Sequence, residues 1–206
     1  VDFINYWLYT FTATCLLCLV EPFVAIWLGQ DFVLAKAILI LAVAIYYFKG
    51  INSGIDIAKN AAGLYYPDRF IPMAEAIANM VISIVLAKRY GIAGVLFGTL
   101  VSFLALSFWA KPYFVCRDVF EVSFARYAVR EGREIVVSVL VAAGTWYAVS
   151  LVSLENVLLS FGVKALLALA LSNGLLLLVY FKTSEFQYLR GLLKSAANRI
   201  GKRKKA

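Results

Sequence analysis

The sequence predicts an all-α integral membrane protein, and two observations support this prediction. Of its 206 residues, 63% are hydrophobic and 16% are charged, with a mean hydropathy of +0.85, whereas soluble proteins average about 45–50% apolar and about 25% charged residues. The hydrophobic residues also occur in runs of about 20, the length that an α-helix needs to cross a bilayer. We therefore expect six transmembrane helices forming one lobe, followed by an amphipathic helix in the membrane interface.

Polar turns separate the predicted helices. The chain turns at 29–31 and again at 63–68, where Pro67 disfavours helical geometry in the residue before it. Asp68 is expected to cap the third helix, and Pro72 is tolerated in its first turn. The six helices are predicted at about residues 3–28, 32–60, 70–88, 92–112, 135–152 and 157–181, which together make a lobe over 1–182.

The fourth helix carries small residues at four-residue spacing, Gly94, Gly98 and Ser102. This spacing places them on one helical face, and small side chains let two membrane helices approach closely. We therefore assign these three residues to helix packing.

Charged stretches precede the fifth helix and follow the sixth. Basic and acidic residues alternate between 111 and 134, and we expect a solvated connection with a surface helix there. Residues 183–206 have one apolar and one basic face and end in a run of Lys and Arg before Ala206. This pattern predicts a cytoplasmic amphipathic tail that lies in the membrane interface.

Lys and Arg are distributed unevenly over the connections. They are concentrated in the second and fourth connections and in the tail, and only the third connection, with Lys88 and Arg89, departs from this alternation. The positive-inside rule therefore predicts that both ends of the chain are cytoplasmic. Contact with anionic membrane lipids accounts for the net charge of +8, so this charge does not indicate a nucleic-acid partner.

Polar side chains inside the second and third helices mark the candidate functional site. In the third helix Glu75, Asn79 and Ser83 repeat every four residues and share one face. Such groups cost several kcal/mol when they face lipid, so they are expected to face protein or a water-filled cavity. The polar face of the second helix consists of Lys49, Asn52, Ser53, Asp56, Lys59 and Asn60.

Local ion pairs are the simpler explanation for some of these charges. Asp56 with Lys59, and Glu75 with Arg69, are close enough in sequence to pair. Such pairs contribute under about 1 kcal/mol when exposed.

The remaining residue types argue against an enzyme. The chain has no His, and Cys15-x-x-Cys18 lies inside an apolar run, where we expect both thiols to pack as small apolar groups. No nucleophile–base set and no metal centre can be assembled from these residues. The sequence therefore predicts neither an enzymatic activity nor a metal site.

Two segments resemble a known family. Residues 21–29 (EPFVAIWLG) and 60–102 (NAAGLYYPDRFIPMAEAIANMVISIVLAKRYGIAGVLFGTLVS) are similar to polysaccharide flippases of the multidrug/oligosaccharidyl-lipid/polysaccharide exporter superfamily. The motifs that carry the resemblance are Gly63-Leu64, Asp68-Arg69-Phe70-Ile71-Pro72, Glu75-Ala76-Ile77-Ala78-Asn79, Lys88-Arg89-Tyr90-Gly91 and Gly94-Val95-Leu96-Phe97-Gly98-Thr99.

The resemblance implies the C-terminal lobe of a MATE-like transporter, in which two six-helix lobes enclose a central cavity. Such flippases move undecaprenyl-diphosphate-linked oligosaccharides across the bacterial inner membrane for O-antigen, capsule or exopolysaccharide synthesis. The partners it implies are the lipid-linked oligosaccharide, membrane lipids and an N-terminal lobe of the same protein. A multidrug or other lipid-linked-substrate exporter of this superfamily, and a non-transporting membrane scaffold, are the alternatives.

For transport of such a substrate, the polar faces have three predicted roles. Lys49, Lys59 and Arg69 are assigned to the diphosphate. Asn52, Asn60, Asn79 and Ser83 are assigned to sugar hydroxyls. Asp56 and Glu75 would hold the cations in place or bind a coupling H⁺ or Na⁺, and no other cofactor is expected.

Overall fold

The computed structural model describes residues 2–64, 66, 69–152, 156–181, 183, 186 and 191. Within these residues all regular structure is helical, and five helical stretches are long and apolar enough to cross a membrane. The predicted class of all-helical protein with several candidate membrane spans is therefore confirmed, although six separate spans were predicted. The five stretches are Phe3–Trp27, Lys36–Ala61, Ile71–Asp118, Phe124–Ser150 and Val157–Tyr180.

The first two helices, α1 (Asp2–Trp27) and α2 (Lys36–Ala61), are joined by a connection that contains the short 3-10 helix η1 (Gln30–Phe32). α1 continues past Pro22, which lies inside it. α2 begins at Lys36 rather than at residue 32, because Phe32 belongs to η1 and the backbone of Ala35 is still extended (φ −55°, ψ 138°).

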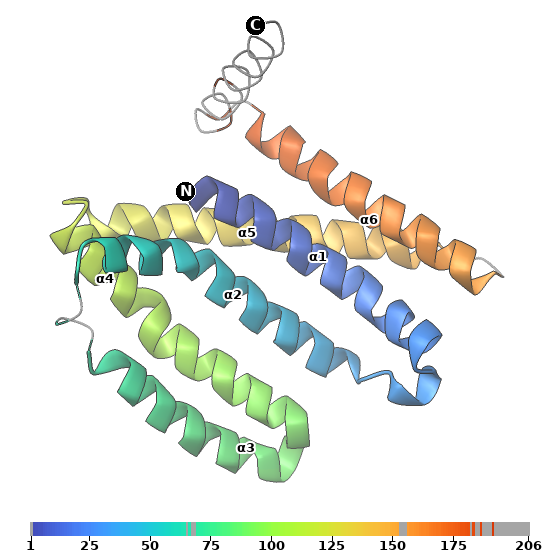
Figure 1. Cartoon of the computed structure of the whole chain (residues 1–206), viewed down its shortest axis with the longest axis horizontal. Helices are drawn as coiled ribbons and strands as arrows, with labels where there is room; N and C mark the ends of the chain where they lie inside the picture. Colours follow the sequence, from blue (N-terminus) through green and yellow to red (C-terminus); the bar gives the residue numbers. More distant parts are fainter. Residues whose placement is uncertain are drawn as a thin grey trace, which may run out of the picture.

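The third stretch folds back on itself at Gly91. It consists of α3 (Ile71–Ser102), the π-helix η2 (Phe103–Ser107) and α4 (Phe108–Asp118). Gly91 has φ 56° and ψ −134°, a conformation that glycine adopts without the steric penalty of a side chain. The chain reverses direction there (Figure 1), so two antiparallel arms, 71–90 and 92–118, form a helical hairpin. This is the position of the turn predicted between the third and fourth helices.

The predicted solvated connection at 111–134 is shorter in the structure. Its first residues complete α4, and α5 (Phe124–Ser150) begins at Phe124 instead of residue 135. Glu131 and Glu134 are only 3% and 4% exposed, because they lie on the face of α5 that packs inside the bundle. The alternation of acidic and basic residues indicated a helix with charged positions, but it did not indicate that the face with Glu131 and Glu134 would be the buried one.

The last described helix is α6 (Val157–Tyr180), which Asn156 caps. The Asn156 side chain accepts hydrogen bonds from the backbone N–H groups of Leu158 and Leu159 at 3.1 and 3.2 Å, as N-cap residues commonly do. The predicted cap Asp68 and, apart from residues 183, 186 and 191, the predicted tail helix lie outside the described residues.

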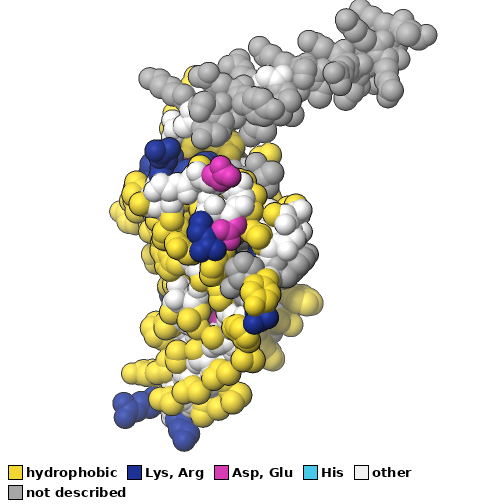
Figure 2. All heavy atoms as spheres, turned by 90° about the vertical axis from the view of Figure 1, so that its left-hand side faces the viewer, with side chains coloured by type: hydrophobic (Ala, Val, Ile, Leu, Met, Phe, Trp, Pro, Cys, Tyr) yellow, Lys and Arg dark blue, Asp and Glu magenta, His cyan; other side chains and the backbone are white. Residues whose placement is uncertain are grey.

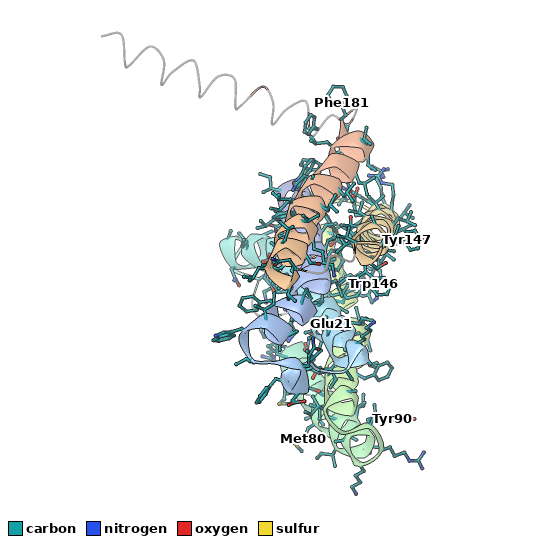
Figure 3. All side chains as sticks on the ribbon, turned by 90° about the vertical axis from the view of Figure 1, so that its right-hand side faces the viewer. Glu21, Met80, Tyr90, Trp146, Tyr147 and Phe181 are labelled. Atoms are coloured by element: carbon teal, nitrogen blue, oxygen red, sulfur yellow. The ribbon has the colours of Figure 1, made fainter. Side chains whose placement is uncertain are left out.

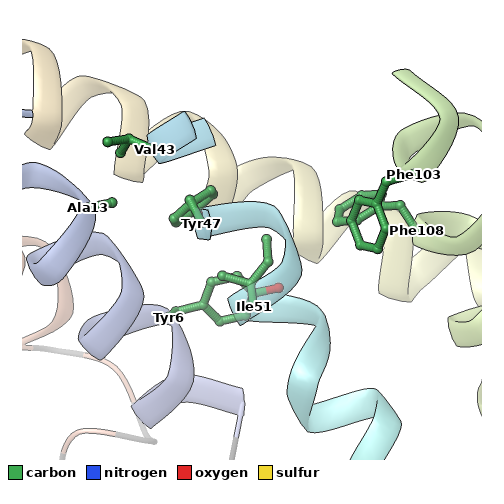
Figure 4. Close-up of a cluster of buried hydrophobic side chains, with 7 residues drawn as sticks. All are labelled: Tyr6, Ala13, Val43, Tyr47, Ile51, Phe103 and Phe108. Carbon is green, nitrogen blue, oxygen red and sulfur yellow. The ribbon is translucent and has the colours of Figure 1, made fainter. Parts of the chain in front are cut away.

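α2 connects α1 to the hairpin. α1 packs against α2, α5 and α6, whereas α2 packs against α1, α3 and α4. In the largest buried cluster the side chains of α2 lie between those of α1 and two phenylalanines of the second arm (Figure 4). The cluster consists of Tyr6, Ala13, Val43, Tyr47, Ile51, Phe103 and Phe108.

The surface is largely apolar, with charges at the ends of the helices. Figure 2 shows hydrophobic side chains over most of one face, interrupted by small groups of charged ones. The α1–α2 connection and the Gly91 turn lie at one end of the bundle, whereas α2 and α4 end, and α3 and α5 begin, at the other (Figure 1). The second end therefore carries Lys59, Arg69, Arg117 and Arg126.

Candidate functional site

Polar side chains of α2 and of the hairpin meet where these elements pack against each other. The Lys49 ammonium lies 5.7 Å from the ring centre of Phe103. The Lys111 ammonium lies 3.0 Å from the Asp56 carboxylate. A third contact joins the two arms of the hairpin, because the Ser107 hydroxyl donates a hydrogen bond to Glu75. We call these residues the junction site: Lys49, Asp56, Glu75, Phe103, Ser107 and Lys111.

The second arm changes its helical geometry within the junction site. Phe103–Ser107 form the π-helix η2, and both of its end residues make junction contacts. A π-turn is wider than an α-turn, is rare, and occurs frequently at functional sites. It also shifts the side chains that follow relative to those before it, and here the fully buried Ser107 reaches Glu75 on the other arm.

The Asp56 carboxylate also forms an ion pair with a residue of the hairpin that the sequence did not indicate as its partner. The sequence indicated Lys59, one turn away, as a possible partner, and the structure shows a pair with Lys111, whose side chain is 16% exposed against 39% for that of Asp56. Glu75 likewise contacts Ser107 and not Arg69. The guanidinium of Arg69 lies 4.3 and 4.5 Å from the ring centres of Tyr66 and Phe70.

We expect the Asp56–Lys111 pair to show an interaction energy of about 1 kcal/mol, because it is partly shielded from water. A double-mutant cycle with Asp56→Asn and Lys111→Gln, followed by unfolding in detergent, measures this energy. The exposed neighbours Arg117 and Asp118, whose side chains are 2.5 Å apart, provide the control cycle, in which we expect no measurable coupling. Equal coupling in the two cycles would contradict a special role for the α2–α4 pair.

The predicted polar face of the third helix lies against the second arm of the hairpin. Asn79 Oδ1 accepts hydrogen bonds from Ser83 at 2.8 Å and from Thr99, on the other arm, at 3.2 Å. The arms approach closely beside this contact, because a Cβ atom added to Gly98 would lie 2.5 Å from Ser83 Oγ. A Cβ atom on Gly94 would lie 2.4 Å from the carbonyl oxygen of Leu86.

The other predicted site residues differ in their surroundings. Ser102 is buried and its hydroxyl donates to the carbonyl of Thr99 at 3.1 Å. Asn52 is 2% exposed, and its side-chain nitrogen has no hydrogen-bond partner among the described residues. Lys59 is half-buried and Asn60 exposed near the end of α2. The structure thus brings Lys49, Asp56 and Glu75 to the junction site and adds Phe103, Ser107 and Lys111, which the sequence did not single out.

A second polar cluster is buried where α5 meets α1 and α6, and sequence reasoning missed it. Thr10 and Ser138 share a hydrogen bond of 2.6 Å. Glu134 accepts hydrogen bonds from Tyr180 and, at 2.8 Å, from Arg133. A signal was present, because polar residues of α5 recur at spacings of three, four and seven residues at Glu131, Glu134, Ser138 and Thr145, all buried.

The described residues contain no group of three or more His, Cys, Asp or Glu side chains that could hold a metal ion. Cys15 and Cys18 belong to a small apolar cluster with Val149 and Ala168. Comparison with models of known families, with curated proteins and with solved structures found no match for the chain.

Proposed function

We propose that this chain is one lobe of an inner-membrane flippase for lipid-linked oligosaccharides, the class that its sequence motifs resemble. The observation that carries the proposal is the junction site. It combines two cations with two carboxylates between apolar helices, and charged groups in such helices mark substrate or ion pathways. A scaffold without transport would have no need for such charges.

The substrate of such a flippase has an anionic diphosphate and many sugar hydroxyls. Lys49 is exposed beside the ring of Phe103 and is available to a diphosphate. Lys111 would form a second contact when the diphosphate replaces Asp56 as its partner. Asn52, Asn60, Asn79 and Ser83 are the candidates for sugar hydroxyls, whereas Lys59 and Arg69 would attract the substrate to the basic end of the bundle.

Coupling to an ion would act through the carboxylates of the same site. A proton or Na⁺ at Asp56 would weaken its attraction for Lys111 and free this cation for the diphosphate. When Glu75 is ionised, its carboxylate accepts a hydrogen bond from the Ser107 hydroxyl. When Glu75 binds a proton, its carboxyl group can instead donate a hydrogen bond to the Ser107 oxygen. Together with an N-terminal lobe, the hairpin and α2 would then expose the site to each side of the membrane in turn, with the basic end in the cytoplasm.

Loss of Lys49 tests this proposal. In bacteria that lack their own flippase, a gene encoding this lobe together with the proposed N-terminal lobe should restore polysaccharide export, and Lys49→Ala should lower export at least about tenfold, because one phosphate contact is worth about 1.4 kcal/mol or more. Lys49→Arg should retain much of the export. Lys164→Ala, which alters a half-buried lysine of α6, is the matched control and should export normally. Normal export by Lys49→Ala at equal membrane levels would refute the role of the junction site.

A further inference from the structure

A cavity of about 350 Å³ lies between α1, α2 and α5, away from the junction site. This volume falls in the range of small-molecule sites, which are mostly apolar with a few polar groups. Glu21 and Trp146, both of which line the cavity, lie on the same side of the bundle (Figure 3). The apolar walls include Leu17, Ile40, Ala44, Val139, Ala142 and Trp146.

The mouth of the cavity has an apolar, exposed rim. Ile40, Val139 and Trp146 are 55%, 59% and 49% exposed on the outer surface of α2 and α5. These helices are long and apolar enough to cross a membrane, and a mouth with an apolar rim admits apolar molecules most readily. The occupant is therefore lipophilic.

One part of the cavity is polar and can donate hydrogen bonds. Thr10, Tyr47 and Ser138 all line it. Tyr47 is only 8% exposed, yet its hydroxyl has no hydrogen-bond partner among the described residues. Thr10 and Ser138 bond to each other, which uses one of their two hydroxyl protons and leaves the other for a ligand. An acceptor atom on the occupant would satisfy the buried Tyr47 hydroxyl.

The charge near these hydroxyls restricts the kind of acceptor. Two buried acidic residues of α5, Glu131 and Glu134, lie about two turns and one turn before Ser138, which lines the cavity. An anionic group next to Tyr47 would be repelled by these carboxylates, since the surroundings are of low polarity. Lys36 and Glu21 both line the cavity. Their opposite charges offset each other, so Lys36 does not make the cavity a site for an anion. The acceptor is therefore neutral, as a carbonyl oxygen is.

We propose that this cavity binds a neutral lipophilic molecule that carries a carbonyl group, taken up from the bilayer, with its carbonyl oxygen bonded to Tyr47. The aromatic side chains of Tyr47, Phe48 and Trp146 along the cavity favour a planar carbonyl-bearing ring. This site is separate from the one proposed for the transported oligosaccharide, and the inference does not rest on flippase activity.

Quenching of Trp146 fluorescence tests the proposal, with ubiquinone-1 as the neutral carbonyl probe. Titration of the detergent-solubilised protein should give saturable quenching that disappears in Trp146→Phe. Tyr47→Phe, which keeps the ring and removes the hydroxyl, should weaken the apparent Kd about five- to tenfold. Ala142→Phe fills the cavity and should abolish the saturable phase. Ala170→Phe, on the exposed surface of α6, is the matched control and should leave binding unchanged.

Three results would overturn the proposal. The first is linear, non-saturable quenching, because the probe would then only partition into the detergent. The second is an unchanged Kd in Tyr47→Phe, which would remove the hydrogen bond on which the assignment depends. The third is displacement of the probe by dodecyl phosphate at equal concentration, because the site would then accept an anion. Circular dichroism of each variant separates loss of binding from loss of folding.

Discussion

Replacing Glu134 by Ala is expected to lower the free energy of unfolding by about 3 kcal/mol. The Glu134 carboxylate accepts hydrogen bonds from Tyr180 on α6 and from Arg133 on α5. Tyr180 is only 5% exposed, so its hydroxyl would remain buried without an acceptor. The loss is measured by titrating the purified protein with a denaturing detergent and following its helical circular dichroism.

Two conservative changes separate the hydrogen bond from the packing around it. Glu134→Gln keeps an acceptor oxygen and should be less destabilising than Glu134→Ala. Tyr180→Phe removes only the donor and should cost about 1 kcal/mol. Glu121→Ala, at an exposed residue before α5, is the control for loss of a carboxylate. If Glu134→Ala unfolds at the same detergent concentration as Glu121→Ala, the network does not stabilise the bundle.

Replacing Gly94 by Ala is expected to destabilise the hairpin by about 2 kcal/mol. The added Cβ atom would lie 2.4 Å from the carbonyl oxygen and 2.6 Å from the carbonyl carbon of Leu86. These are backbone atoms of the other arm, which cannot rotate away as a side chain does, so the two arms must separate. Unfolding in the same detergent titration measures the effect.

Gly144→Ala is the matched control for this change. Gly144 also lies inside an apolar helix, α5, but an added Cβ atom there meets nothing within 4 Å. We expect Gly144→Ala to be neutral or to stabilise slightly, because alanine restricts the unfolded chain. Equal stability of the two variants would contradict the close approach of the arms at Gly94.

The helical membrane fold could be predicted from the sequence because its cause is local. A bilayer requires each spanning segment to satisfy its own backbone hydrogen bonds and to present apolar side chains, and both requirements act within one run of residues. The reversal of the chain at Gly91 was predictable for the same reason, since it lies next to a charged pair, Lys88 and Arg89, between two apolar runs. Spacing also placed Glu75, Asn79 and Ser83 on one face.

The partners of the polar residues were decided by the tertiary structure. Spacing identifies residues that share a helical face, but it does not say which neighbouring helix that face will meet. Asp56 therefore finds Lys111 on α4, and Glu75 finds Ser107 across the hairpin. The π-helix η2 lies where the second arm contacts Lys49 of α2 and Glu75 of the first arm, and sequence spacing did not indicate it.

Burial of charge depended most strongly on the tertiary arrangement. Glu131 and Glu134 belong to a stretch in which acidic and basic residues alternate, a pattern that is typical of solvated helices. They are nevertheless buried, because α1 and α6 supply the hydroxyl groups of Tyr6 and Tyr180 that compensate their loss of water. The sequence by itself determined which segments are helical and apolar, since that property is local. Only the packing of helices distant in sequence decided which carboxylates find partners and can be buried.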